Sequence, residues 1–428
     1  MAYNLNLPSL IRANRDALGE GEVMSEPLIV VGNGMAAARF VEELQKRALG
    51  RYAIAVIGAE PRLAYNRVLL SSLLADEIEF ADIELKAAGW WRDRGVTLRY
   101  GVRATAVDSV ARTVTLANGA PLGFSKLVFA TGSQPIRLPI SGMELPGVLT
   151  FRDIDDVNAI TLAKAAGARV VVIGGGLLGL EAAYGLAKAG AEVTVIHLMN
   201  RLMERQLDER AALMLRRAVE AKGITVRLET ETKRIVGDRR VEAVETKDGS
   251  VIPADAVVVA IGIRPNADLA RDAGLAVNRG IVVDDHIETA VRGIHAIGEC
   301  AEHRGVCYGL VEPAYEQART LARRLAGEDA TYPGSVLATN LKVSGVSVFS
   351  AGDFMGATAG SDEIVLNDPG LGVYKKLVFV NDRLTGAVLF GDTSDGLRYL
   401  DLMRSGRSIA RVRDDLVFGA EDITRIAA

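Results

Sequence analysis

Two short apolar segments of the chain are each followed by a glycine-rich turn and then by a helical pattern. The first is Leu28–Val31, whose turn leads into an amphipathic stretch reaching about Arg47 and then into a second apolar run, Ala53–Gly58. A continuous run of four to eight apolar residues is typical of a strand that is buried on both faces. The same order recurs in Val170–Ile173, the turn 174–179, an alanine-rich stretch through Lys188 and the run Glu192–Ile196. The pattern therefore predicts two copies of a strand–turn–helix–strand unit with parallel strands.

The turns carry the residue types that hold a dinucleotide. The first small residue permits the tight turn, the second lets the backbone approach a pyrophosphate, and the third allows close packing of the helix on the strand. The helix N-terminus then faces the phosphate charge. Glu60, which we expect at the end of the second strand of the first copy, is placed to bind the adenosine ribose. One such motif is weak evidence, but two copies indicate two sites, with contacts expected from Gly32, Gly34, Met35, Ala36 and Ala37 in the first and from Gly174, Gly176, Leu177, Gly179 and Gly262 in the second.

Two further apolar runs end in Ala-Thr-Gly and Gly-Glu, and they resemble motifs of the flavoproteins with two dinucleotide-binding domains; they are residues 127–133 and 293–300. The resemblance implies that the first site holds FAD and that Thr131 and Gly132 line it. It also implies that the acid after Gly298 bonds the ribityl chain, where Glu299 replaces the more usual aspartate. Pro313 lies early in a long helix whose N-terminus, by the same resemblance, points at the flavin and stabilises negative charge on the reduced ring.

The order of these motifs predicts an α/β chain with two Rossmann-like domains, one for FAD and one for NAD(P), and a smaller C-terminal α+β domain. The strand Ala256–Ile263 and the following Arg-Pro-Asn mark the return from the second nucleotide domain to the first. Strand-like runs follow at Lys342–Ser350, Tyr374–Val380 and Ala387–Phe390. We expect a disordered tail or misassigned start at 1–24, the FAD domain at 25–145 and 265–330, the NAD(P) domain at 146–264 and the C-terminal domain at 331–428.

At a finer level the sequence resembles the flavoprotein portion of the assimilatory NAD(P)H-nitrite reductase large subunit and the related electron-transfer subunits of assimilatory nitrate reductase. The resemblance covers nearly all of residues 25–428 and is carried by AYNRVLLSS at 64–72, RLMERQLD at 201–208 and GECAEHRGVCYGL at 298–310. Nitrite reductase large subunits continue into a cysteine-cluster domain and a sirohaem and iron–sulfur domain. This chain has two cysteines, whereas a Cys₄ cluster needs four. The resemblance therefore implies a reductase module that feeds a separate acceptor, either a nitrate or nitrite reductase component or a small iron–sulfur protein.

Composition narrows the classes of partner and compartment. The net charge is −4, and because nucleic-acid binding depends on neutralising phosphates, we expect no nucleic-acid partner. The longest apolar run, Val170–Leu180, is interrupted by glycines and is shorter than the roughly 18 residues of a membrane span. Residues 1–24 lack the long apolar stretch and cleavage site of a signal peptide. Two cysteines form no disulfide framework and fit a reducing cytoplasm.

Cys300, His303 and Cys307 are residue types that bind zinc. A fourth ligand is not evident near them in the sequence, and the segment already has an expected flavin role, so we predict no metal. Buried structural thiols, or pairing of the two cysteines, remain the alternatives. A catalytic cysteine like that of the disulfide reductases and NADH peroxidases is excluded, because residues 67–74, where it would lie, contain none.

A few side chains outside the loops are candidates for tuning the two sites. By the resemblance, Arg67 supplies a positive charge near FAD, while Ser72 stands where related ferredoxin reductases carry a lysine. Glu181 matches a position near the nicotinamide end, or is a solvated carboxylate at the start of its helix. His197 stands where an acid would bind the ribose 2′-hydroxyl; a neutral ring could accept that bond, and a protonated ring with Arg201 could tolerate a 2′-phosphate. An exposed residue at the strand end is the alternative for His197.

These patterns predict an FAD-dependent NAD(P)H oxidoreductase that passes electrons to a separate partner in nitrate or nitrite assimilation. No protein side chain is predicted to be catalytic, because the flavin carries the chemistry. NADH is favoured over NADPH, since no arginine pair directly follows the strand that ends at Ile196. A ferredoxin or rubredoxin reductase and a non-catalytic flavin redox sensor remain alternatives. The candidate docking surface for an acidic partner, or otherwise a solvated helix face, comprises Arg404, Arg407, Arg411 and Arg413.

Overall fold

A computed structural model describes residues 25–119, 121–164, 166–343 and 345–419, so the tail predicted at 1–24 lies outside the described residues. The described residues form two compact units, one within 25–66, Ile83–Gln134 and Arg264–Ser335 and the other within Arg67–Asp82, Pro135–Ile263 and 336–419. This division places residues 67–82 in the second unit, whereas the sequence prediction kept them with the first nucleotide domain. The four domain boundaries stay a prediction.

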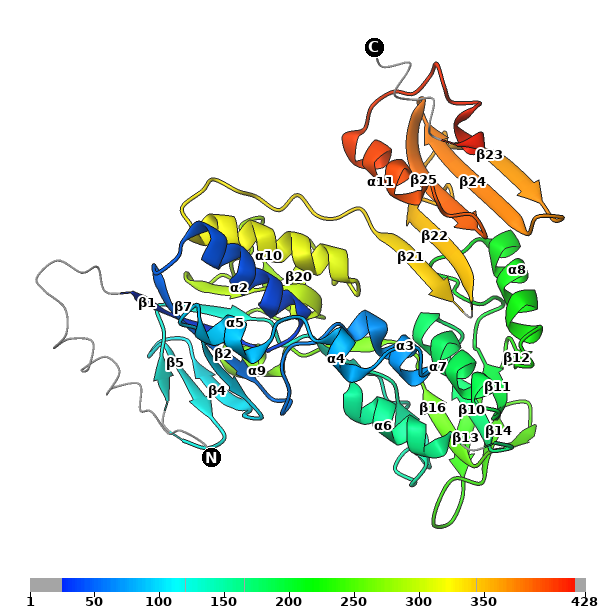
Figure 1. Cartoon of the computed structure of the whole chain (residues 1–428), viewed down its shortest axis with the longest axis horizontal. Coiled ribbons are helices and arrows are strands. Elements are labelled where there is room, and N and C mark those ends of the chain that lie inside the picture. The colour runs from blue at the N-terminus through cyan, green and yellow to red at the C-terminus, as the bar shows by residue number, and fades with distance from the viewer. Residues whose placement is uncertain (1–24, 120, 165, 344, 420–428) are drawn as a thin grey trace, which may run out of the picture. The chain divides into compact units, whose positions relative to one another are not determined.

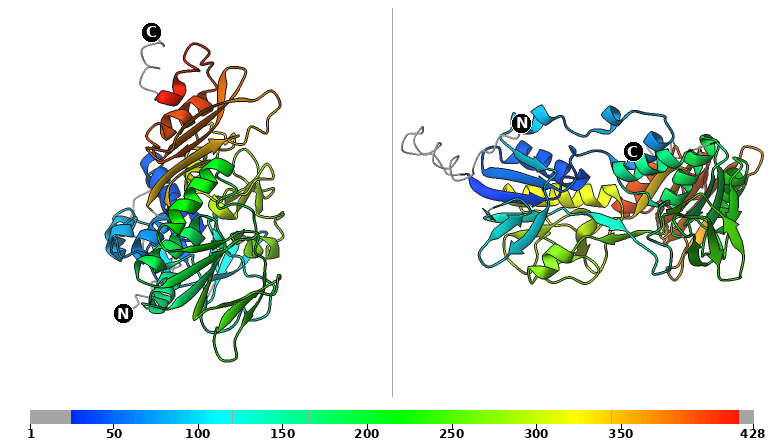
Figure 2. Two further views of the ribbon diagram at one scale, coloured as in Figure 1. Left: turned by 90° about the vertical axis from the view of Figure 1, so that its right-hand side faces the viewer. Right: turned by 90° about the horizontal axis from the view of Figure 1, so that it is seen from below.

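A parallel five-stranded sheet forms the centre of the first unit, in the order β19-β7-β1-β2-β3. Helices α2 (Met35–Arg47) and α10 (Val311–Leu325) pack against each other over one face of it, as Figures 1 and 2 show in blue and yellow. Phe40 and Leu44 of α2 and Leu321 of α10 share one buried core with the sheet residues. The apolar positions of α2 recur every three to four residues, and this spacing turns one helical face toward the sheet. The strands are β1 (Glu26–Val31), β2 (Tyr52–Gly58), β3 (Thr97–Tyr100), β7 (Lys126–Phe129) and β19 (Ile294–Ala296).

The opposite face of the first sheet is covered by smaller elements, and a second core runs between them and residues such as Ile29 and Phe129. An antiparallel sheet there comprises β4 (Ala104–Asp108), β5 (Thr113–Leu116) and β6 (Leu122–Gly123). The remaining elements of the unit are α5 (Ala88–Arg92), α9 (Asp268–Asp272), β18 (Ile281–Val283), η2 (Gly298–Cys300) and β20 (Ala301–His303).

The second unit repeats the parallel arrangement in a sheet of order β12-β11-β10-β16-β9. Asp153 and Asp208 cap the helices α6 and α8 by accepting a main-chain N–H of the first turn, which explains where these helices begin. The strands are β9 (Val148–Thr150), β10 (Arg169–Ile173), β11 (Glu192–Ile196), β12 (Thr225–Arg227) and β16 (Ala256–Val259). The helices are η1 (Arg67–Leu69), α3 (Leu70–Leu74), α6 (Ile154–Ala163), α7 (Leu177–Lys188) and α8 (Glu209–Glu220), and the antiparallel strands are β13 (Thr232–Val236), β14 (Ala243–Thr246) and β15 (Val251–Pro253).

The predicted return strand Ala256–Ile263 is wrong as a single element. β16 ends at Val259, and a separate strand, β17 (Ile263–Pro265), begins after Gly262 and pairs with β8 (Ser133–Pro135). Gly262 has a φ of +119°, a conformation that L side chains rarely adopt. The glycine therefore turns the chain where the apolar pattern alone suggested continuous extension.

The C-terminal part of the second unit is a five-stranded antiparallel sheet of order β21-β22-β25-β24-β23, with α11 (Gly396–Ser405) packed on it (Figure 1). The run Lys342–Ser350 does not form one strand as predicted, because β21 ends before Gly345 (φ +83°) and β22 begins after it. β23 was not predicted, since its apolar run is only the three residues Ile364–Leu366 between charged and polar ones, and it lies at the edge of the sheet. The bounds are β21 (Ala338–Val343), β22 (Val346–Gly352), β23 (Asp362–Asp368), β24 (Val373–Val380), β25 (Arg383–Phe390) and η3 (Leu416–Phe418).

The predicted fold class is confirmed, with two Rossmann-like parallel sheets and a smaller C-terminal domain built on an antiparallel sheet. The short α4 (Phe80–Ile83) completes the elements. In the part of the chain that the structure describes, no helix combines the length and apolarity that crossing a membrane would require.

Candidate functional site: two glycine loops

The first glycine loop joins β1 to α2. Gly32 has a φ of +120°, and a Cβ there would lie 2.0 Å from the carbonyl oxygen of Ala130, so only glycine fits. Gly34 is the N-cap of α2, and a Cβ built on it meets no described atom within 4 Å. No described side chain caps the first turn of α2, which leaves its N–H groups to an anion. The loop thus has both the open space and the donors that a pyrophosphate needs.

The second glycine loop, between β10 and α7, has the same construction. Gly174 has a φ of +122°, and a Cβ there would lie 2.2 Å from the carbonyl oxygen of Ala260. Gly176 is the N-cap of α7, where the described residues again leave a Cβ position open to 4 Å and provide no side-chain cap. A Cβ at Gly179 would lie 2.0 Å from the oxygen of Gly174, so the third glycine lets helix and loop pack closely. The two loops are therefore structural repeats as well as sequence repeats.

The Gly-Glu motif lies beside the first loop. Gly298 has a φ of +78°, and a Cβ on it would lie 3.0 Å from the Cβ of Ala36. Glu299 accepts a 2.8 Å hydrogen bond from the Ser133 hydroxyl, and its Oε2 lies 4.0 Å from the Cβ position of Gly132. Residues predicted from three separate segments are thus brought together at one edge of the first sheet. Thr131 lies there too, and its hydroxyl donates to the carbonyl oxygen of Asn266 at 2.6 Å.

Gln317 joins this group and was missed by the sequence reasoning. It lies on α10, four residues after Pro313, and its side chain is fully buried. Its Oε1 accepts a 2.7 Å hydrogen bond from the N–H of Gly298, while its Nε2 finds no partner among the described residues. A polar residue within the apolar face of an amphipathic helix is the signal that could have revealed it.

Glu60 does not end a strand, because β2 ends at Gly58. It follows in the turn, where its Oε2 accepts a 2.7 Å hydrogen bond from the Tyr65 hydroxyl. The Asn33 side chain of the glycine loop donates to the carbonyl oxygen of Arg62 in the same turn. The turn that carries Glu60 is therefore tied to the first loop by side-chain contacts.

His197 is buried rather than exposed at the end of β11. Its Nδ1 accepts a 3.0 Å hydrogen bond from the N–H of Gly175, and its Nε2 lies 3.1 Å from a carboxylate oxygen of Glu204. Arg201 donates to the carbonyl oxygen of Leu207 at 3.4 Å. The reading of His197 as an exposed strand-end residue is wrong, and its contacts belong to the second glycine loop.

Glu181 projects from α7 toward α3, within the second unit. Burial raises the pKa of its carboxyl to about 8, partly opposed by a side-chain hydrogen bond with Ser71. A solvated carboxylate would not show this shift, so that alternative fails; its place near a nicotinamide stays a prediction. Arg67 lies in η1 of the same unit, where it donates to the carbonyl oxygen of Arg152 at 3.2 Å.

The segment with Cys300, His303 and Cys307 makes contacts that are structural. Cys300 is fully buried and its thiol donates to the carbonyl oxygen of Ile297 at 3.3 Å. His303 pairs with Asp285 at 2.9 Å, and burial raises the pKa of both thiols, that of Cys307 to about 11. Within residues 25–119, 121–164, 166–343 and 345–419, no three His, Cys, Asp or Glu side chains form a cluster suited to a metal. Because their raised pKa keeps both thiols protonated at neutral pH, they are poor nucleophiles.

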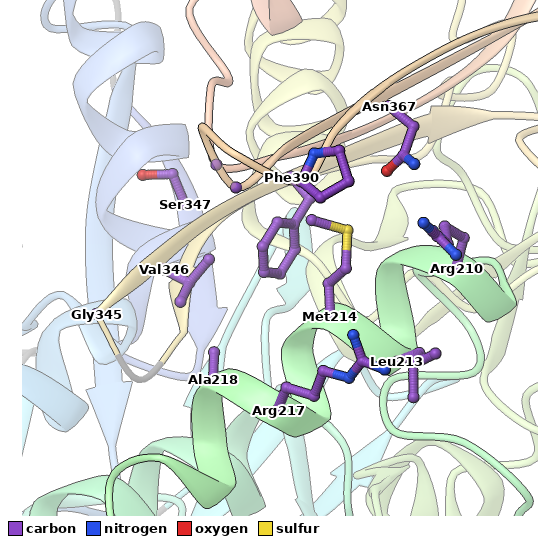
Figure 3. Close-up of a pocket in the computed structure, with 13 residues that line it drawn as sticks. Arg210, Leu213, Met214, Arg217, Ala218, Gly345, Val346, Ser347, Asn367 and Phe390 are labelled. Atoms are coloured by element: carbon purple, nitrogen blue, oxygen red, sulfur yellow. The ribbon is translucent and has the colours of Figure 1, made fainter.

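A cavity of about 460 Å³ lies between α8 and the loops of the C-terminal sheet. Arg210, Met214 and Arg217 line it from the helix, and Phe390 lines it from β25 (Figure 3). None of the predicted cofactor residues is among the residues that line this cavity. The two glycine loops, each with its own neighbours, are therefore two separate candidate sites.

Comparison with known proteins agrees with this geometry. The model of the pyridine nucleotide-disulphide oxidoreductase family matches residues 26–320, the segment that holds both glycine loops. The chain belongs to this family. A second model, the rubredoxin NAD+ reductase C-terminal domain, matches residues 338–407.

Comparison with individual proteins shows which members of the family this chain resembles. The chain is 46% identical over 384 residues to a nitrite reductase [NAD(P)H] of Bacillus subtilis (strain 168), covering 90% of this chain and 48% of that protein. It is 41% identical to the assimilatory nitrate reductase electron transfer subunit of the same organism, covering 91% and 51%. Putidaredoxin reductase, solved in a covalent complex with putidaredoxin, superposes with a TM-score of 0.86 at 25% identity over 95% of this chain and 99% of that one. The chain spans about half the length of these two Bacillus relatives. The predicted resemblance to nitrite reductase and to the nitrate reductase electron-transfer subunit is confirmed.

The family implies FAD and NAD(P)H, and the residues of the first loop fit a flavin dinucleotide. Gly34 leaves space at an uncapped helix terminus, and buried polar atoms of Asn33 and Gln317 have no partner among the described residues. FAD, when bound, supplies the hydride and electron chemistry. The chain is thus an NAD(P)H-dependent flavin oxidoreductase related to nitrite and nitrate reductase components and to ferredoxin reductases.

Proposed function

We propose that this chain takes electrons from NAD(P)H and passes them through FAD to a separate redox protein of nitrate or nitrite assimilation. The observation that carries the proposal is the pair of similarly built glycine loops, each with an uncapped helix terminus and an open second glycine. The similarity to a nitrite reductase and to a nitrate reductase electron transfer subunit supports the pathway. A reducing cytoplasm remains the expected compartment.

We assign one dinucleotide to each of the two glycine loops. We assign FAD to the domain of residues 25–145 and 265–330, where Glu299 would accept from the ribityl hydroxyls and Glu60 from the ribose. NAD(P)H is assigned to residues 146–264, on the loop of Gly174 and Gly176. NADH is the preferred donor. No side chain is assigned a covalent or proton-transfer step, so the protein binds and orients the two dinucleotides.

The acceptor surface is proposed on the C-terminal domain, residues 331–428. Arg407 and Arg411 are exposed there, and an acidic partner would be steered by such charge. Arg413 forms an ion pair with Asp362, and its guanidinium lies 5.0 Å from the centre of the Phe379 ring, so its charge is partly offset within the protein. We therefore centre the candidate surface on the exposed Arg407 and Arg411, with Arg404 and Arg413 near them in the sequence.

The test is reconstitution with FAD, followed by NADH-driven reduction of a small dye and of three protein acceptors. The acceptors are a sirohaem nitrite reductase lacking its flavoprotein portion, a [2Fe–2S] ferredoxin and a rubredoxin. Efficient transfer to the first, and to neither small protein, supports assimilation. Dye reduction without transfer to the nitrite reductase component would refute that part of the proposal.

A ferredoxin or rubredoxin reductase is the second candidate, favoured by the match of residues 338–407 to the rubredoxin NAD+ reductase C-terminal domain. Preferential reduction of a ferredoxin or rubredoxin in the same panel would select it. A non-catalytic flavin sensor is the third candidate. It predicts flavin and dinucleotide binding with negligible steady-state dye reduction.

A further inference from the structure

The segment after β11 brings a carboxylate to the second glycine loop. Nδ1 of His197 accepts the N–H of Gly175 at 3.0 Å, so the ring proton must be on Nε2. Nε2 then donates to Oε2 of Glu204 at 3.1 Å. Both ring nitrogens are occupied within the protein, and His197 keeps no free nitrogen for a ribose hydroxyl.

Packing and main-chain contacts fix where Glu204 lies. A Cβ on Gly175 would come within 2.8 Å of Cγ of His197 and 2.7 Å of Cδ2 of Leu202, so both side chains are packed directly on the loop. Met203 donates its N–H to the carbonyl oxygen of Gly175 at 3.0 Å and holds a φ of +50°. A non-glycine residue with positive φ costs energy and persists only where the surroundings impose it. Residues 202–204 are therefore locked onto the loop, and Glu204 is carried with them.

Other charged groups nearby are already engaged. Asp208 uses one carboxylate oxygen on the N–H of Ala211 and the other on the Tyr374 hydroxyl at 2.6 Å. Arg201 donates to the carbonyl oxygen of Leu207 and to Oδ1 of Asn200. Glu204 in contrast is about one-fifth exposed, and its Oε1 is 3.8 Å from the largely exposed Arg205. This ion pair is longer than a hydrogen bond, so Oε1 keeps a lone pair for a hydroxyl donor.

We propose that Glu204, positioned by His197, is the group that accepts the hydrogen bond of the adenosine ribose and selects NADH against NADPH. The inference rests on the proposed binding of NAD(P)H at the second glycine loop. The carboxylate favours a 2′-hydroxyl donor and repels a 2′-phosphate. The acid that selects the coenzyme, Glu204, thus lies seven residues after the strand-end position. His197 stands at that position and holds Glu204 by a hydrogen bond.

The experiment measures binding directly, by titration calorimetry with ADP-ribose and with its 2′-phosphate on the FAD-loaded protein. Glu204→Gln keeps the size of the side chain but removes its charge. We expect ADP-ribose to bind about 10-fold more weakly and the 2′-phosphate as well as before or better, because a charge-assisted hydrogen bond and a repulsion are both lost. The matched control is Glu220→Gln, an exposed carboxylate on α8 paired with Arg216, which should leave both affinities unchanged.

His197→Asn tests the positioning role, because it should move the ratio of the two affinities in the same direction as Glu204→Gln without abolishing binding. A ratio that stays at the wild-type value in Glu204→Gln overturns the inference, and so does an equal loss for both ligands. If the ratio of the two affinities is unchanged in His197→Asn, the positioning role of His197 is refuted. Failure of the proposed function is distinguishable, since wild-type protein would then bind neither ligand and NADH would not bleach its flavin.

Discussion

Gly176 and Gly174 lie two residues apart in the same loop, yet substitution by valine should affect them in opposite ways. At Gly176 the φ is −81° and an added Cβ meets no described atom within 4 Å, so Gly176→Val should cost the fold no more than about 1 kcal/mol as a change of N-cap residue. At Gly174 the φ of +122° and the contact of 2.2 Å with the oxygen of Ala260 combine. Strain and overpacking there should cost roughly 3–5 kcal/mol.

The space that is open at Gly176 is where a pyrophosphate would approach the backbone. Loss of two charge-assisted hydrogen bonds at about 1.5–3 kcal/mol each should weaken NADH binding by 100-fold or more. The assay is anaerobic flavin reduction followed over a range of NADH concentrations, with FAD content and thermal unfolding measured on the same samples. Gly176→Val should keep its FAD and its unfolding temperature but resist reduction, whereas Gly174→Val should unfold at lower temperature.

Wild-type NADH dependence in Gly176→Val would refute the placement of the dinucleotide on this loop. Full stability of Gly174→Val would refute the backbone argument. Gly34→Val supplies the mirror control, because its Cβ position is equally open but belongs to the first loop. It should lose FAD and leave ADP-ribose binding intact.

Three further outcomes are expected. Glu299→Leu should weaken FAD retention by roughly 1–3 kcal/mol, because a partly buried acceptor is lost; unchanged FAD affinity on dialysis would place the ribityl chain elsewhere. Glu181→Gln should remove a pH dependence: the pKa is raised from 4.5 to about 8 in the folded protein, so the associated stability is complete below pH 4.5 and is lost as the pH rises through about 8. The free energy of unfolding of the wild type should fall relative to the variant by up to about 1.4 kcal/mol per pH unit in this window, and a carboxylic C=O infrared band that titrates near pH 8 should be missing from the variant. Cys307, with a pKa raised to about 11, should react with iodoacetamide at neutral pH much more slowly than a free thiol in a peptide; rapid alkylation of the folded protein would contradict the raised pKa of this partly buried thiol.

The parallel core of both nucleotide sheets could be predicted from the sequence because its signals are local. β11 was predicted with its observed bounds, and β1, β2 and β10 to within two residues, since strands buried on both faces read as continuous apolar runs. The same rule failed where a glycine interrupts an apolar run, at Gly262 and Gly345. It also failed at β23, an edge strand whose apolar run, Ile364–Leu366, is only three residues long.

The residues that surround the loops depended on contacts between distant segments. Gln317 reaches Gly298 from another element, and Glu204 is held at Gly175 by a histidine that the strand position alone had marked as the ribose ligand. By itself the sequence determined that two glycine turns each open a helix, because backbone conformation at a glycine and hydrophobic periodicity are encoded within a few residues. Only the tertiary structure decided which groups form hydrogen bonds with each other. The reason is that a buried nitrogen or oxygen bonds to whichever group the packing brings within about 3 Å.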